Sequence, residues 1–191
     1  MGFREDAKVL MGDLREAFNG NISVESSKND LGDISTYIAV CENDIWDDTT
    51  TYATIGLSTV ATGYSLDGVD LAVELVAVVG CNVLDYGNVL GSIATNAKSF
   101  GLPCIEGSIH DDILSMYYPD IDAKHVFLTQ SWLWDDLYIS NLNNKKVTWL
   151  TPIPITDSEK QFIEQYGGSV FLNILEENNI NVQDIYRSSV C

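Results

Sequence analysis

The sequence predicts a single α+β domain in which a mixed, largely antiparallel sheet is flanked by helices. Three observations lead to this fold class. Apolar residues make up 46% of the 191 residues and charged residues 20%, which is enough apolar material for one core. Segments with strand and helix patterns do not alternate strictly, as they would in a doubly wound parallel sheet. No repeat or low-complexity linker divides the chain into two domains.

The N-terminal part begins with an amphipathic helix. Residues 3–18 place apolar side chains at helical spacing, and Asn19-Gly20 is a typical C-terminal stop. The following segments are expected to be a polar connector, a strand, an acidic turn and a second strand, over 21–33, 34–42, 43–50 and 51–58.

The middle of the chain contains one long apolar strand and one helix. After turn residues at 62–68, the apolar run 69–79 predicts a strand that is buried over much of its length. Helical spacing of apolar residues predicts a helix over 83–100, with Gly101 as its stop. We expect the next segments to be irregular at 102–114 and strands at 125–134 and 146–150.

The junction after residue 150 contains two prolines. Pro152 and Pro154 cannot donate to a strand ladder, so we expect strand pairing to stop there. Thr156 and Glu159 have the T-x-x-E spacing of a capping box, which predicts an abrupt helix start near residue 157. A second short helix is expected over 169–179, after a break at two glycines.

The charge is strongly negative and unevenly distributed. The net charge is −18, and the stretch from Asn29 to Asp136 has 17 acidic residues against only two basic ones, Lys98 and Lys124. Such a surface repels nucleic acids and anionic membranes and accelerates the encounter with basic partners. The alternative is that the charge serves solubility alone. No apolar run reaches the roughly 18 residues that a membrane helix needs.

The sequence contains no familiar catalytic motif. Nucleophile elbow, phosphate loop, dinucleotide and H-E-x-x-H patterns are absent, and the four cysteines form no C-x-x-C pair. We therefore expect no enzymatic activity, no metal and no cofactor. The stretch with His110, Asp111 and Asp112 is expected to be a solvated acidic loop, with a metal-dependent hydrolase as the alternative. His125 is expected to be a paired structural histidine.

Protein binding is the function that these exclusions leave. IWDD (45–48) and LWDD (133–136) each place two carboxylates after a tryptophan, a composition typical of protein interfaces. Trp134 is expected to be a buried anchor, whereas Trp46 fits either a buried or an interface position. The expected partner contacts are Asp44, Trp46, Asp47, Asp48, Asp111, Asp112, Asp135 and Asp136.

The chain resembles the suppressor-of-fused-like domain family. In VTWLTPIPITDSEK, a Trp-containing strand leads through proline and Ile-Thr to a helix that opens with glutamate, and LEENNINVQDIYRSSV is similar to the family's closing segment. The resemblance is clearest over 147–190 and weaker over 52–80, where TIGLS and ELVAV resemble earlier strands. Ser188 stands where the family often has proline. Asp184 and Arg187 are expected to form a structural ion pair or a partner site.

The resemblance implies a non-catalytic α+β domain that binds proteins. Short bacterial members are similar to immunity proteins, or antitoxins, that neutralise polymorphic toxins, including nuclease toxins of the LXG type. We therefore predict a cytoplasmic immunity protein that binds a basic cognate toxin, expected to be a nuclease, through its acidic surface. No nucleic acid or membrane partner is expected. A protein-binding adaptor or regulator unrelated to toxins is the alternative.

Overall fold

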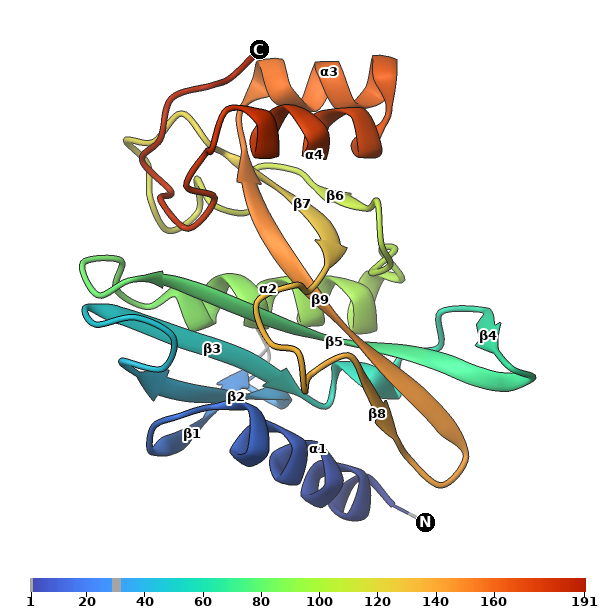
Figure 1. Cartoon of the computed structure of the whole chain (residues 1–191). Helices are drawn as coiled ribbons and strands as arrows, with labels where there is room; N and C mark the ends of the chain where they lie inside the picture. The colour runs from blue at the N-terminus through green and yellow to red at the C-terminus, as the bar shows by residue number, and fades with distance from the viewer. Residues whose placement is uncertain (1, 29–31) are drawn as a thin grey trace.

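The computed structural model describes residues 2–28 and 32–191, which form one mixed sheet with helices around it (Figure 1). The strand order is β1-β2-β3-β5-β9-β7-β6, with β4 paired to β5 and β8 paired to β9. Every pair is antiparallel except β5 with β9. The strands are β1 (Ile22–Lys28), β2 (Ile34–Glu42), β3 (Thr49–Ile55), β4 (Tyr64–Leu66), β5 (Val69–Gly80), β6 (Ile109–His110), β7 (His125–Gln130), β8 (Ile139–Asn141) and β9 (Lys145–Ile155). The predicted fold class is confirmed.

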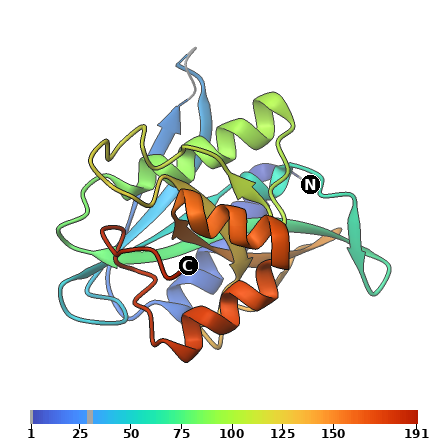
Figure 2. The same cartoon turned by 90° about the horizontal axis from the view of Figure 1, so that it is seen from above.

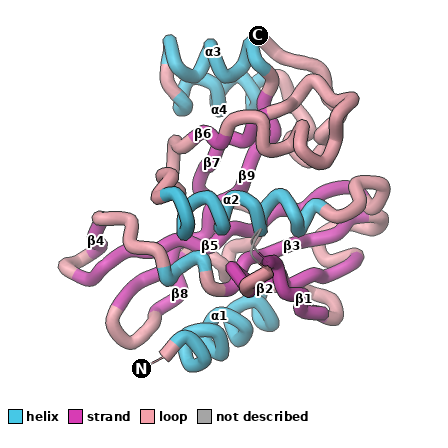
Figure 3. Tube along the Cα trace, turned by 180° about the vertical axis from the view of Figure 1, so that it is seen from behind, coloured by secondary structure: helices cyan, strands magenta, loops and turns pink. Residues whose placement is uncertain are grey.

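The helices cover three different parts of the sheet. α1 and α2 lie on opposite faces, and α2 runs across β1, β2 and β3 when the molecule is seen from behind (Figure 3). α3 and α4 lie side by side over the start of β7 and the end of β9 (Figure 2). None of the helices in the described part of the chain is long and apolar enough to span a bilayer. The helices are α1 (Phe3–Ala17), α2 (Tyr86–Phe100), α3 (Asp157–Tyr166), α4 (Gly168–Glu177) and a 3-10 turn at Leu57–Thr59.

The central strand β5 supplies both faces of the core. Successive strand side chains point to opposite faces, so Leu75, Ala77 and Val79 pack under α2. Val76 and Val78 pack on the other face with α1. A strand covered by helices on both sides needs apolar residues at nearly every position, which explains why only Asp70 and Glu74 interrupt the apolar run over 69–79.

Most predicted elements are confirmed at their predicted positions. The 34–42 strand coincides with β2, and the helices predicted at 3–18 and 83–100 correspond to α1 and α2. The capping box is present: the Thr156 hydroxyl accepts the N–H of Glu159, and the Glu159 side chain accepts the N–H of Thr156. These elements depend on hydrophobic periodicity and on helix or strand end signals within a few residues, and both can be recognised in the sequence.

The polar segment 21–33 was expected to be a connector, and this expectation is wrong for residues 22–28. They form β1, the edge strand of the sheet, which pairs with β2 from Ile22 to Lys28. The strand is exposed over most of its length, and only Ile22 and Val24 in it are apolar, which is too short a pattern to predict a strand. Residues 29–31 lie outside the described residues. The strand predicted at 125–134 ends earlier than expected, at Gln130.

The prediction that pairing stops at the prolines is also wrong. Pro152 and Pro154 lie within β9, opposite Leu128 and Val126 of β7. Among the described residues, β9 pairs with β5 only as far as Leu150, so beyond this point one edge of β9 has no strand beside it. A proline nitrogen that faces such an edge removes no ladder hydrogen bond. The prolines therefore fit into the strand, and they deny its open edge two donors.

The closing segment of the chain is fixed by a buried ion pair. The Arg187 guanidinium donates to Glu159 Oε1 at 2.6 Å and Oε2 at 2.9 Å, and to the carbonyl oxygen of Pro154 at 2.7 Å. Glu159 is fully buried and also accepts the N–H of Val190 at 3.1 Å. Arg187 thus pairs with Glu159 and not with Asp184, so the sequence identified a structural role correctly but named the wrong partner.

Candidate protein-binding surface

Asp44 holds the acidic turn between β2 and β3 in place. Its Oδ1 accepts the N–H of Asn19 at 2.7 Å, and its Oδ2 accepts the Thr51 hydroxyl at 2.9 Å and the Trp134 indole N–H at 3.1 Å. The residue is only 4% exposed. Because its carboxylate is buried and satisfied, Asp44 offers no surface to a partner. It positions the exposed residues that follow it.

The hydrogen bond between Trp134 and Asp44 links the two stretches that each have a tryptophan and two carboxylates. Trp134 is buried, as expected, and its ring centroid lies 5.8 Å from that of Phe18. Trp46 is 45% exposed. The fold therefore brings the turn 43–48 and the loop 131–138 together, and four of the expected contact carboxylates on them are exposed: Asp47, Asp48, Asp135 and Asp136.

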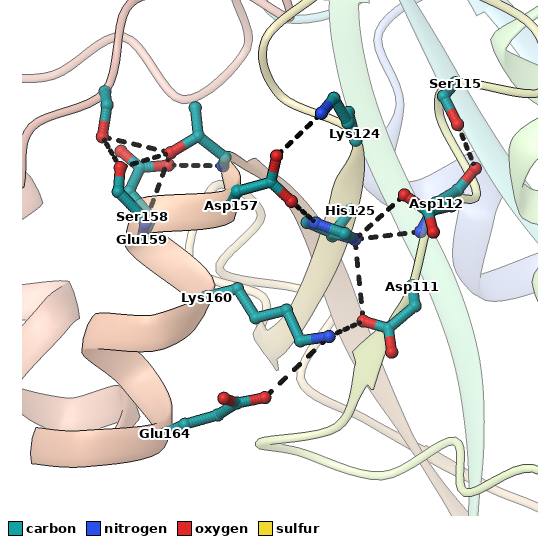
Figure 4. A network of polar contacts seen from close by, with 12 residues as sticks. Asp111, Asp112, Ser115, Lys124, His125, Asp157, Ser158, Glu159, Lys160 and Glu164 are labelled. Atoms are coloured by element: carbon teal, nitrogen blue, oxygen red, sulfur yellow. Dashed lines mark hydrogen bonds and ion pairs between the residues drawn. The ribbon is translucent and has the colours of Figure 1, made fainter.

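A second polar cluster forms around His125 at the start of β7 (Figure 4). The His125 Nδ1 accepts the backbone N–H of Asp112 at 2.9 Å, so the other ring nitrogen of the neutral imidazole carries the proton. That nitrogen lies 2.9 Å from Asp157 Oδ1, and Lys124 Nζ lies 2.7 Å from Asp157 Oδ2. The expected structural role of His125 is confirmed, because its ring ties the loop before β7 to the first residue of α3.

The expected contacts Asp111 and Asp112 belong to this second cluster. Their carboxylates lie 3.6 Å and 3.7 Å from His125 Nδ1, and Asp111 also lies 2.6 Å from Nζ of Lys160 on α3 (Figure 4). Both residues are exposed. However, the chain's own cation already compensates Asp111, so this pair has less free charge than the acidic turn.

His110 takes no part in either cluster of carboxylates. It lies in β6, is 4% exposed, and its Nε2 has no hydrogen-bond partner among the described residues. Burial lowers the pKa of its imidazole. The expectation of a solvated loop is therefore wrong for His110. In the part of the chain that the structure describes, no group of three or more histidine, cysteine or acidic side chains is placed to hold a metal.

A groove of about 480 Å³ opens beside the acidic turn, and the sequence did not indicate it. Asp48 lies on its rim with three further acidic residues that come from β1, from the end of β2 and from the residue before α2: Glu25, Glu42 and Asp85. These residues are far apart in the chain, and only the fold brings them to one groove. The one feature of the sequence that could have pointed to the groove was the high density of acidic residues on both sides of the turn.

Comparison with known proteins identifies relatives along the whole chain. The family model of the suppressor of fused protein (SUFU) matches residues 32–188. The immunity protein YqcF of Bacillus subtilis (strain 168) is 32% identical over 191 residues, which cover 100% of both chains.

Two solved structures have a similar fold. A SUFU homolog from Neisseria gonorrhoeae FA 1090 superposes with a TM-score of 0.74 at 15% identity and covers 98% of each chain. The structure of the Sufu–Fu complex gives a TM-score of 0.68 at 14% identity and covers 99% of this chain and 92% of that one. At these identities the likeness concerns the fold alone.

Proposed function

The chain belongs to the suppressor of fused family, and on that premise we propose that it is an immunity protein that binds and neutralises a cognate toxin. The observation that carries this proposal is the full-length similarity to a bacterial protein named as an immunity protein, at 32% identity without unmatched ends. Inhibition by binding needs no catalytic residue of its own.

The proposed partner is a basic toxin domain, and a nuclease is the class we expect. Nucleases hold phosphates and therefore tend to have basic surfaces, which an acidic protein can cover. The net charge of −18 supports this choice, and so does the stretch 29–136, which has 17 acidic residues and only two basic ones. We expect the encounter to take place in the cytoplasm, without nucleic acid or membrane as a partner.

The proposed contacts are centred on the turn 43–48 and the loop 131–138. Trp46 is a large exposed side chain of the kind that anchors interfaces, and both segments have exposed carboxylates. The buried Asp44–Trp134 hydrogen bond holds the two segments together before a partner arrives, which reduces the entropy that binding must cost. Asp111 and Asp112 form a second, partly compensated contact group.

Charge reversal in the turn tests this proposal. The basic C-terminal domain of a toxin encoded beside the gene is titrated against the wild type and the Asp47→Lys/Asp48→Lys variant. We expect the variant to bind at least about tenfold more weakly, because two attractive charge contacts become repulsive. The matched control is Asp120→Lys/Asp122→Lys, which changes the net charge equally at two exposed residues outside the turn.

Four results distinguish the possibilities. Weaker binding of the turn variant alone supports the proposed surface. If all three proteins bind with equal affinity, the turn is not part of the interface. If both variants bind equally more weakly, the effect is due to net charge and not to the turn. If the wild type binds no toxin domain and does not restore growth of cells that express one, the immunity function itself is contradicted.

The alternative function, an adaptor for an unrelated protein, is favoured by a different observation. An apolar groove of about 590 Å³ lies between the end of β9, α4 and the closing segment, where Ile153, Leu172 and Ile180 line it and Trp132 stays 48% exposed. A partner in this groove would bind largely by apolar burial, so its affinity would depend little on salt. Binding that is insensitive to salt and lost in Leu172→Asp would support the adaptor.

A further inference from the structure

The groove beside the acidic turn has an apolar floor and an anionic rim. It is lined by residues of β1, β2, β3 and the start of α2. Ile38, Val40 and Tyr52 form the apolar part of its floor, beside polar side chains that include Ser27 and Thr50. Four carboxylates lie on its rim: Glu25, Glu42, Asp48 and Asp85. Among the residues that the structure describes, no lysine or arginine lines it. The two properties together restrict what the groove can bind.

The rim carboxylates are not neutralised by the chain itself. Among residues 2–28 and 32–191, every ion pair joins other side chains, and none includes a carboxylate of this rim. Their field converges on the floor: burial raises the pKa of the Tyr52 phenol, and Asp85, Glu25 and Glu42 raise it further. Like charges along a concave wall concentrate the potential inside it.

The start of α2 determines the shape of the groove. A Cβ atom on Gly87 would lie 3.1 Å from Ile38 Cγ2 and 3.3 Å from Tyr52 Cδ1, so the absence of a side chain lets the helix approach the floor closely. Asp85 precedes the helix at a φ of 60° and contributes one rim carboxylate. The groove is thus closed on one side by the helix and remains open beside the acidic turn.

An apolar floor below an anionic rim matches a long cationic side chain. The methylene groups of arginine or lysine pack on apolar surface while the charged head stays at the polar edge. Arginine suits this site better than lysine, because its planar guanidinium binds carboxylates with two hydrogen bonds and stacks on aromatic rings such as that of Tyr52. A hydrated metal ion would gain nothing from the apolar floor.

We propose that this groove receives an arginine side chain of the protein partner, as the specific subsite within the broader acidic surface. The proposal rests on the proposed function, since it assigns a position to the basic toxin domain. It extends that function by placing the contact on Glu42 and Asp85, outside the turn 43–48. Asp48 is common to the turn and the groove, and the test therefore leaves it unchanged.

The test compares the wild type with Glu42→Gln/Asp85→Asn, which keeps the size of both side chains and removes two rim charges. Asp120→Asn/Asp122→Asn is the control with the same change in net charge. Calorimetric titration with the basic toxin domain should give a dissociation constant at least about tenfold larger for the groove variant and nearly unchanged for the control. Circular dichroism and thermal unfolding confirm that all three proteins are folded.

A second readout tests the groove without the toxin. In a two-dimensional NMR titration with hexa-arginine peptide, we expect the largest shift changes at the amides of Tyr52 and Gly87, and we expect them to disappear in the groove variant. Shift changes spread evenly over acidic residues, or unaffected by Glu42→Gln/Asp85→Asn, would overturn the groove. Equal changes with spermidine or Mg²⁺ would assign it to small cations and also overturn the proposal.

The two readouts separate failure of the subsite from failure of the proposed function. Toxin binding that is equal in the groove variant and the wild type overturns the subsite and leaves the immunity function in place. Absence of toxin binding by the wild type contradicts the immunity function, and the hexa-arginine titration then decides whether the groove still selects an arginine-bearing partner.

Discussion

At the scale of single residues, Glu159 joins two functions in one carboxylate. It closes the capping box that starts α3, and it receives the Arg187 guanidinium from the closing segment. The two stretches that carry the family resemblance therefore contact each other in the fold, where the helix after the prolines meets the end of the chain.

Removal of Arg187 tests the energetic weight of this contact. Arg187→Ala leaves the fully buried Glu159 without its cation, and an unpaired buried charge costs about 3–5 kcal/mol. We expect the free energy of unfolding in urea to fall by that amount. The control Lys146→Ala breaks the surface ion pair with Asp67 and should cost less than about 1 kcal/mol. Similar losses in both variants would contradict a special role for Arg187.

The acid stability of the protein should depend on Asp157. Hydrogen bonds from Lys124 and His125 lower the pKa of its carboxyl group from 3.8 to about 2, because they favour the charged form. A carboxyl group with a lowered pKa in the folded state stabilises the fold above its ordinary pKa, and this stabilisation is lost as the pH falls through the folded value.

Asp157→Asn measures that contribution. The wild type should be more stable than the variant in urea unfolding at about pH 7 and about pH 4, and the difference should vanish toward about pH 2. Asp120→Asn, at an exposed carboxylate, should show no such pH-dependent difference. A difference between wild type and Asp157→Asn that stays constant down to about pH 2 would contradict the assignment.

At the scale of elements, glycines determine how closely α2 approaches the sheet. The sequence has glycines at positions 87 and 91, four residues apart within a helical pattern. In the fold both lie on the face of α2 that meets the outer strands. Gly87 contacts the floor of the groove, and Gly91 lies against Ser27 of β1. Their role is close packing.

Gly91→Ala should destabilise the protein although alanine favours helices. The new Cβ would lie 2.1 Å from the Ser27 Oγ and 2.9 Å from its Cβ, which forces α2 and β1 apart. We expect a loss of about 1–3 kcal/mol in the free energy of unfolding. Gly12→Ala in α1, where no atom lies within 4 Å of the new Cβ, should instead gain about 0.5–1 kcal/mol. A gain in both variants would disprove the close approach.

At the scale of the whole molecule, negative charge is widespread but only part of it is available to a partner. Lys160 compensates Asp111, and Asp44 is buried. The turn 43–48, the loop 131–138 and the rim of the groove retain exposed carboxylates without ion pairs among the described residues. Other exposed carboxylates, such as Asp120 and Asp122, also lie outside these ion pairs, so uncompensated charge extends beyond the turn.

Such a surface should control how fast the partner associates. We expect the association rate constant with the toxin domain to fall at least about tenfold between low and high salt, while the dissociation rate changes less. Stopped-flow mixing of the two proteins measures both. The variant Asp135→Asn/Asp136→Asn should show a weaker salt dependence. An association rate that does not respond to salt would mean that the charge serves solubility and would favour the adaptor.

Elements whose signals are local can be predicted from the sequence. The helix α1, the strand β2, the buried strand β5 and the capping box of α3 each depend on spacing or end signals within a few residues, and all were predicted. The family was also recognisable, because its motif lies in two continuous stretches near the end of the chain. The excess of acidic over basic residues in the middle of the chain also led to the hypothesis of a basic partner.

Which of these residues can act together depends on contacts that only the folded chain makes. Asp44 was a plausible contact in sequence, but a hydrogen bond to Trp134, 90 residues away, buries it and turns it into a support. The edge strand β1 and the prolines within β9 were missed for the same reason, since each depends on which strand lies beside it. Burial, charge compensation and neighbouring strands are properties of contacts between distant segments, and local sequence patterns do not contain them.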